Sequence, residues 1–289
     1  MKNTKRLLAF VLAVAVMLGN VPGREVQAKS RPKTKAHAYY MYDITKGEKI
    51  LSKDANKRIY PASTVKLLTA LTVLDHASTQ QKIVYTKKIR KKVPGDASSL
   101  NLRTERTYTV EQYLHMLLIV SDASSATALA IGTAGSRKRF VGWMNEKAQS
   151  LGMTNSSFDN PIGLDVGSGY NKTYTTAADF MKASRAAMDN EVISKIVAKK
   201  KYRVSPVGVK KSFVIKNTNA FYFKFKKLVK NKKYMIIGSK TGTTRAAGHC
   251  LVATAVDDRG HKVICAFYGK GSYERLYKDV KKLFDYAYA

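Results

Sequence analysis

A serine and a lysine three residues apart are the first side chains in this sequence that could do chemistry together. Ser63 and Lys66 follow Pro61, and a strongly apolar stretch begins at Leu67. The pattern predicts a buried helix that begins near Pro61 and holds both side chains on one face of its first turn. Burial lowers the pKa of a lysine, and a neutral amine can take the proton of a serine hydroxyl. The pair therefore indicates either a nucleophile with its base or a helix-capping serine beside a surface lysine.

Two more segments favour the nucleophile. Ser121 follows a second apolar helix, predicted over residues 110–120, and Lys240-Thr241-Gly242 lies on a predicted strand far downstream. The order S-x-x-K, serine and K-T-G is the motif order of the serine β-lactamases and penicillin-binding proteins. Three motifs in this order are much more specific than S-x-x-K alone.

From about Ala36 to the C-terminus, the sequence resembles the D-alanyl-D-alanine carboxypeptidases, the low-molecular-mass penicillin-binding proteins. Residues 152–164 resemble the G-M-x-N-T-x-F-x-N-P-x-G-L loop of that family, with Ser156 where threonine is usual. Asn217-Thr218-Asn219 resembles the N-T-N that precedes its K-T-G strand. The resemblance implies a serine-type D-Ala-D-Ala carboxypeptidase that trims the terminal D-alanine of peptidoglycan stem peptides through an acyl-enzyme and is inhibited by β-lactams.

The resemblance also implies a role for each catalytic side chain. Ser63 would be the acylated nucleophile and Lys66 its general base. Ser121 would relay a proton to the leaving amine. No metal and no organic cofactor is implied.

The substrate would be held by the K-T-G strand. Lys240 and Thr241 would bind the terminal carboxylate of the stem peptide, because a cation and a hydroxyl both hydrogen-bond to such a group. Gly242 would let the substrate backbone approach closely. The N–H groups of Ser63 and Thr243 would form the oxyanion hole. Two further candidates for the carboxylate are Arg245 and Arg275.

One position departs from the family. The middle motif of the family is S-x-N, whereas this sequence reads Ser121-Asp122-Ala123. The missing asparagine amide normally helps to hold the base lysine and the substrate amide, and alanine can do neither. Asp122, Ser124 or Ser125 could compensate. A second hypothesis is therefore a catalytically impaired, wall-binding homologue.

A β-lactamase is the third hypothesis. Fast deacylation needs a group that activates water, which in class A enzymes is a glutamate on the loop across the site. The corresponding loop here, residues 158–164, offers Asp159 and Asn160 but no glutamate. We therefore expect slow deacylation.

The N-terminus has the pattern of a secretory signal peptide over residues 1–28. Basic residues precede an apolar run at 7–18, which is shorter than the roughly 20 residues of a membrane span, and small residues end at Ala28. Residues 29–35 would then be a basic tether, and residues 36–289 a D,D-peptidase catalytic domain with no extra C-terminal domain. We expect an exported protein at the cell wall or the outer face of the cytoplasmic membrane.

The formal net charge of +32 suggests an anionic partner. Nucleic acid is a poor candidate, because the chain carries an export signal and lacks an aromatic-studded basic motif. Basic runs such as Lys199-Lys200-Lys201 suit anionic wall polymers or the membrane surface. Solvated surface faces are an equally good explanation of these runs.

The order of the expected elements predicts an α+β fold of the β-lactamase/transpeptidase type. Strands at residues 37–44 and 48–51 come first, helices fill the middle, strands return, and a helix at 272–288 closes the chain. We expect one antiparallel sheet of about five strands with its first and last strands adjacent. Cys250 and Cys265 flank a predicted turn in this sheet; two buried thiols are slightly preferred over a cross-strand disulfide.

Overall fold

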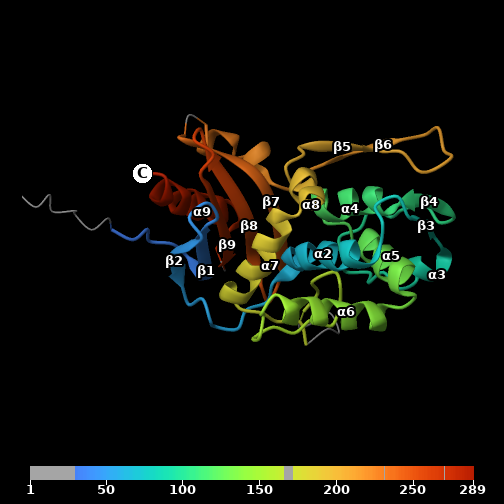
Figure 1. Cartoon of the computed structure of the whole chain (residues 1–289). Coiled ribbons are helices and arrows are strands. Elements are labelled where there is room, and N and C mark those ends of the chain that lie inside the picture. Colours follow the sequence, from blue (N-terminus) through green and yellow to red (C-terminus); the bar gives the residue numbers. More distant parts are fainter. Residues whose placement is uncertain (1–29, 166–171, 231, 270) are drawn as a thin grey trace, which may run out of the picture. The chain divides into compact units, whose positions relative to one another are not determined.

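Five antiparallel strands form the centre of the computed structural model, which describes residues 30–165, 172–230, 232–269 and 271–289 (Figure 1). β1 and β9 are neighbours, so the first and last strands of the chain lie side by side. The predicted α+β fold with its five-stranded antiparallel sheet is confirmed. In spatial order the strands are β2 (Glu48–Lys53), β1 (Ala36–Asp43), β9 (Lys262–Gly269), β8 (Gly248–Asp257) and β7 (Tyr234–Thr244).

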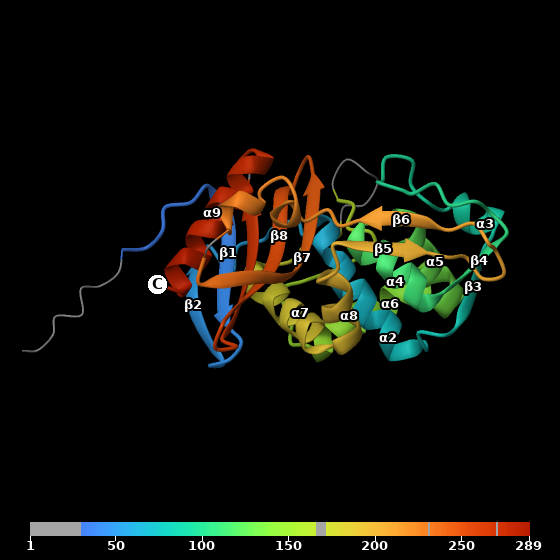
Figure 2. The same ribbon diagram turned by 90° about the horizontal axis from the view of Figure 1, so that it is seen from above.

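Helices cover both faces of this sheet. α9 (Tyr273–Ala287) packs on one face, against β1, β8 and β9. Its apolar residues recur at helical spacing, so they form one buried stripe. On the other face, α7 (Ala177–Asp189) packs on β1 and β9, and α8 (Glu191–Val197) packs on β7. Figure 2 shows α9 on the side of the sheet away from the helical region. The buried stripe of α9 contains Leu276, Val280, Leu283 and Phe284.

The helical region is assembled around α2 (Lys66–His76), which is buried from Lys66 to Val73. This confirms the buried helix that the apolar stretch predicts. α4 (Val110–Ile119), α5 (Ala123–Ala134) and α6 (Arg137–Ser150) all pack against it. The small side chains of α5 permit close packing with its neighbours.

Thr109 precedes α4 and forms a capping box with Gln112. The Oγ1 of Thr109 accepts a hydrogen bond from the N–H of Gln112 at 3.2 Å, and the Oε1 of Gln112 accepts one from the N–H of Thr109 at 3.1 Å. This reciprocal pair satisfies donors that a helix N-terminus leaves free. The helix is thereby fixed at its start and delivers Ser121 just beyond its end.

Two small ribbons flank the helices. β5 (Lys201–Val204) pairs with β6 (Phe213–Lys216), and β3 (Lys82–Tyr85) pairs with β4 (Arg106–Thr109). β4 and the short helix α3 (Lys87–Arg90) lie in a segment whose sequence is merely basic and polar. Pairing of β4 depends on a partner about 20 residues away, so no local pattern reveals it.

The two cysteines are free thiols on opposite faces of the sheet. In the β8–β9 register, Cys250 lies opposite Tyr268 and Cys265 lies opposite Ala253, so the cysteines are not cross-strand neighbours. Burial raises the pKa of both thiols. The preferred interpretation of two buried thiols is confirmed.

Residues Pro32–Ala289 form one compact unit. The predicted signal peptide, residues 1–28, lies outside the described residues. Within the described part of the chain, every helix is too short or too polar to cross a membrane.

Candidate active site

Ser63 lies on a 3-10 turn, η1 (Ala62–Val65), that continues directly into α2. The Nζ of Lys66 lies 2.9 Å from the Oγ of Ser63 and donates a 2.7 Å hydrogen bond to the carbonyl of Ile162. The lysine is only 1% exposed. Its desolvation lowers its pKa to about 7, although the negative charge of Asp122 opposes the shift. The predicted pair is therefore present, and a large fraction of Lys66 is neutral at pH 7.

Two glycines clamp this turn from opposite sides. A Cβ placed on Gly242 of β7 would lie 2.7 Å from the N of Ser63. A Cβ on Gly163 would lie 2.0 Å from the carbonyl oxygen of Ala62, and Gly163 has a φ of +92°. Ala62 itself has a φ of +47°, a strained value for a residue with a side chain. Only glycine at both positions permits the packing that holds Ser63 in place.

A second serine–lysine pair adjoins the first. Ser121 lies in the turn between α4 and α5, with a φ of +63° and 9% exposure. The Nζ of Lys240, on β7, donates hydrogen bonds to the Oγ of Ser121 at 3.0 Å and to the carbonyl of Thr241 at 2.7 Å. Burial and the nearby charge of Lys66 together hold the pKa of Lys240 well below its ordinary value. All four side chains thus belong to one site.

The predicted K-T-G strand forms the edge of that site. The Oγ1 of Thr241 lies 2.7 Å from the Oγ1 of Thr218, whose N–H donates to the carbonyl of Ile119 at the end of α4. Thr243 contacts His249 of β8, with its Oγ1 3.0 Å from the ring Nδ1. Thr218 and His249 are not among the predicted site residues. The N-T-N resemblance was the available signal for Thr218, and nothing in the sequence singles out His249.

The loop at residues 152–165 holds Lys66 from the other side. Asn160 is fully buried, and its Oδ1 accepts hydrogen bonds from the N–H groups of residues 162–164. This turn directs the carbonyl of Ile162 at Lys66. Sequence reasoning missed this contact, because a backbone carbonyl leaves no signature in the residue types.

Ala123, the departure from the family motif, is fully buried as the first residue of α5. Asp122 caps that helix, and its carboxylate accepts a hydrogen bond from the N–H of Ser125 at 2.7 Å. The Ser124 and Ser125 hydroxyls hydrogen-bond to groups other than Lys66. Of the three candidates to compensate for the missing amide, Asp122 alone acts on Lys66, through its charge.

The two candidate arginines differ in their surroundings. The Nε of Arg275 donates a 3.0 Å hydrogen bond to the Oδ1 of Asp279 within α9. Arg245 is exposed on the turn between β7 and β8, directly after Thr244. Arg245 is therefore the better placed of the two to meet a ligand on β7.

This arrangement suits acyl transfer by a serine whose proton is taken by a lysine. The Ser63 hydroxyl, the buried Lys66 amine with its pKa near 7 and the hydroxyl groups on the edge strand β7 lie in one site. The described residues contain no cluster of three or more His, Cys, Asp or Glu side chains that could hold a metal ion. Fold and site together define a serine peptidase of the penicillin-binding type.

The sequence model of the D-alanyl-D-alanine carboxypeptidase family matches residues 25–270, and the chain belongs to this family. It is 28% identical to D-alanyl-D-alanine carboxypeptidase DacF of Bacillus subtilis, over 99% of this chain and 71% of that protein. The structure of a D-alanyl-D-alanine carboxypeptidase from Mycobacterium tuberculosis superposes with a TM-score of 0.78 at 28% identity, covering 91% of this chain and 94% of that one. The Streptomyces K15 DD-transpeptidase superposes with a TM-score of 0.80 at 28% identity, covering 89% and 98%. The resemblance stated from the motifs is confirmed, and the chain is a serine-type peptidase.

Proposed function

We propose that Ser63, Lys66 and Ser121 perform the catalytic steps of a D-Ala-D-Ala carboxypeptidase. The observation that supports this most strongly is the 2.9 Å contact between Lys66 Nζ and Ser63 Oγ. Because that lysine is buried and has a pKa of about 7, it can accept the serine proton at neutral pH.

Acylation begins when the Oγ of Ser63 attacks the carbonyl carbon of the penultimate D-alanine while Lys66 takes the hydroxyl proton. The N–H groups of Ser63 and Thr243 stabilise the negative charge that forms on the carbonyl oxygen. The C–N bond then breaks, and the leaving D-alanine receives a proton from Lys66 through Ser121. In deacylation, water attacks the ester, Lys66 takes a proton from it and returns one to the Oγ of Ser63, and the shortened peptide leaves.

Lys240 and Thr241 hold the terminal carboxylate of the stem peptide in this proposal. Lys240 forms no ion pair with any described residue, so a carboxylate would supply the missing countercharge. Arg245 is placed to add a second cation. Gly242 follows Lys240 and Thr241 on the same strand, and its lack of a side chain lets the strand lie against the turn that carries Ser63.

β-Lactams would acylate Ser63 in the same way and leave slowly. Asp159, the only acid within residues 158–164, has both carboxylate oxygens engaged. Its Oδ1 accepts from the Nδ2 of Asn160 at 2.8 Å, and its Oδ2 accepts from the N–H of Lys172 at 3.1 Å. A carboxylate bound in this way is poorly suited to activate water, which argues against a β-lactamase.

The direct test is the intact mass of the protein after mixing with penicillin. We expect a stable adduct on the unmodified chain and on the control Ser78→Ala, an exposed serine, and none on Ser63→Ala. D-Alanine release from a D-Ala-D-Ala peptide should fall by roughly 10⁴- to 10⁶-fold in Ser63→Ala. A folded, unmodified protein that gives neither adduct nor D-alanine would favour the impaired, wall-binding homologue.

We further propose that residues 1–28 direct export, that residues 29–35 form a basic tether and that residues 36–289 are the catalytic domain. The family's peptidoglycan substrate and the basic composition support an extracytoplasmic protein held weakly by anionic wall polymers or the membrane surface. N-terminal sequencing of the exported protein should begin at Lys29. Retention on isolated envelopes should fall steeply with salt, and retention that is insensitive to salt would contradict the electrostatic proposal.

A further inference from the structure

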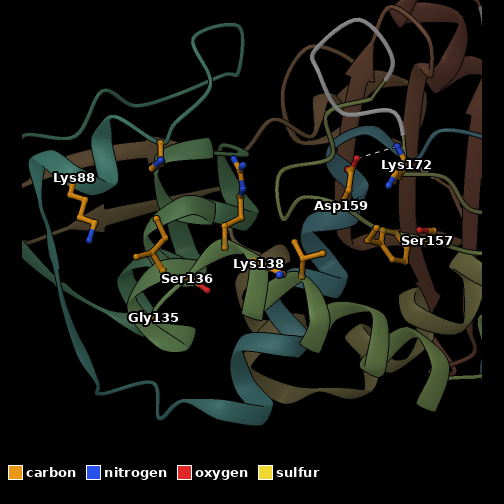
Figure 3. A pocket seen from close by; sticks show the side chains of 12 residues that line it. Lys88, Gly135, Ser136, Lys138, Ser157, Asp159 and Lys172 are labelled. Carbon is orange, nitrogen blue, oxygen red and sulfur yellow. Dashed lines mark hydrogen bonds between the residues drawn. The ribbon is translucent and has the colours of Figure 1, made fainter.

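A pocket of about 660 Å³ lies on the helical region, apart from the residues that contact Ser63 and Lys66 (Figure 3). Its walls come from α3, the C-terminal end of α5, the first turns of α6 and the loop at residues 157–159. This loop also leads to the carbonyl that contacts Lys66, so the pocket and the active site border the same loop. The volume lies within the range of pockets that hold a drug-sized ligand.

The lining is strongly positive. It contains five cations and a single carboxylate, that of Asp159. In the described part of the chain, the side chains of four of these cations form no ion pair, so their charge is available to a ligand. These four cations are Lys88, Lys92, Lys138 and Lys172, and the fifth is Arg137.

Asp159 does not offset this charge, because its carboxylate has a structural role. It accepts hydrogen bonds from the side chains of Asn160 and Thr173 and from the backbone N–H of Lys172. Figure 3 shows the bond to the Lys172 backbone as a dashed line at the mouth of the loop. The Asp159 carboxylate thus contacts Asn160 and the segment at residues 172–173, and not the ammonium groups of the lysines.

Two further features point to an organic anion. α6 is 14 residues long and its N-terminus lines the pocket at Ser136, so the helix dipole adds to the positive potential. Ile131, Val141 and Phe158 add apolar side chains to the lining. Lysines dominate the rim, and their flexible point charges suit several separated phosphates better than one carboxylate held in bidentate geometry.

We propose that this pocket binds a segment of a linear phosphate polymer of the cell envelope. The pocket is concave, and its cations come from three separate segments of the chain, so a chain of spaced charges fits it and a flat lipid surface does not. This inference rests on the proposed export of the chain and does not depend on the assigned catalytic residues. Binding there leaves Ser63 and Lys240 uncovered, so the polymer retains the enzyme without blocking it.

The test uses a short inorganic polyphosphate of defined length as the probe, with affinity measured by calorimetry at several salt concentrations. The pocket variant is Lys88→Glu/Lys138→Glu, and both lysine side chains are exposed. A second variant, Lys88→Gln/Lys138→Gln, removes the positive charges without adding negative ones. The matched control is Lys226→Glu/Lys227→Glu, an exposed pair on η3 (Lys226–Leu228) with the same change in net charge. Thermal unfolding of each variant establishes that it is folded.

We expect the pocket variant to weaken polyphosphate binding at least about tenfold and to reduce the slope of log K against log salt by roughly 1.4, about 0.7 for each lost contact. The control should change affinity less than about twofold. Equal weakening by both variants, or no binding by the unmodified protein, would overturn the pocket assignment. If the unmodified protein binds phosphatidylglycerol vesicles equally strongly and the pocket variant loses this binding, the ligand of the pocket is a lipid surface and the polymer assignment is wrong. D-Alanine release is measured on the same preparations, so failure of the proposed activity is seen separately from failure of polyphosphate binding.

Discussion

The two serine–lysine pairs of this protein have similar contacts and opposite origins. Lys66 lies 2.9 Å from Ser63, three residues away in the chain, whereas Lys240 lies 3.0 Å from Ser121, which is 119 residues away. One turn of helix is enough to make the first pair. The second exists only because β7 runs past the end of α4.

Their electrostatic surroundings differ as well. Burial lowers the pKa of both lysines, but the charge of Asp122 opposes the shift at Lys66, whereas the positive charge of Lys66 deepens it at Lys240. The pKa of Lys66 of about 7 suits the role of general base that we propose for it. Lys240 has no acidic partner among the described residues, and a bound carboxylate would raise its pKa and restore its charge. This difference supports our proposal that the Ser63–Lys66 pair transfers protons and that Lys240 of the second pair binds an anion.

The largest effect is expected when Lys66, the proposed base, is replaced. Lys66→Met fills the buried position with an unbranched apolar side chain of similar length. It also removes the donor to the Ile162 carbonyl, so we expect the free energy of unfolding to fall by about 1 to 3 kcal/mol. Acylation by penicillin should slow by roughly 10²- to 10⁴-fold, which is the usual contribution of general base catalysis. Stopped-flow acylation rates measure this, and an unchanged rate would remove Lys66 from the mechanism.

The pH dependence of acylation is a second test of Lys66 as the general base. The base acts in its neutral form, so the rate should fall about tenfold for each pH unit below the Lys66 pKa of about 7 and level off above it. Acylation rates measured between about pH 5 and 9 test the sign. In Lys66→Met the step near pH 7 should be absent; if it persists there, another group is titrating.

A smaller effect is expected for the second pair. Lys240→Met removes a charge-assisted hydrogen bond to the substrate carboxylate, a loss of about 1.5 to 3 kcal/mol, or roughly 10- to 150-fold in kcat/KM for a D-Ala-D-Ala peptide. A peptide ending in an amide should lose much less. Equal losses for the acid and the amide would mean that Lys240 does not recognise the carboxylate.

The smallest effect concerns the contact that brings β7 to the nucleophile. Gly242→Ala places a methyl group 2.7 Å from the N of Ser63, so the strand or the turn must shift, at a cost of about 1 to 3 kcal/mol. We expect a lower thermal midpoint together with slower acylation. Gly95→Ala is the control, because a Cβ there meets nothing within 4 Å. If both variants behave alike, the close approach at Gly242 is not needed.

Local patterns predicted much of the fold because they report on single elements. The apolar stretch after Lys66 predicted the buried helix α2, and the helices expected at residues 110–120 and 272–288 correspond to α4 and α9. β4 escaped prediction because strand pairing depends on a distant partner. The pairing register of the strands that carry Cys250 and Cys265 could not be predicted for the same reason. A shift of one residue would move each side chain to the other face of the sheet.

The sequence by itself determined the residue types and the local pair: Ser63 and Lys66 must share a helical turn, and their motifs identify the family. Tertiary structure decided what that pair can do. The packing of other segments around Lys66 removes it from water, and this desolvation lowers its pKa to about 7. The carbonyl of Ile162, from a distant loop, accepts the second hydrogen bond of Lys66. Such effects depend on which atoms exclude water and which carbonyls point inward, and those are fixed only when distant segments pack together.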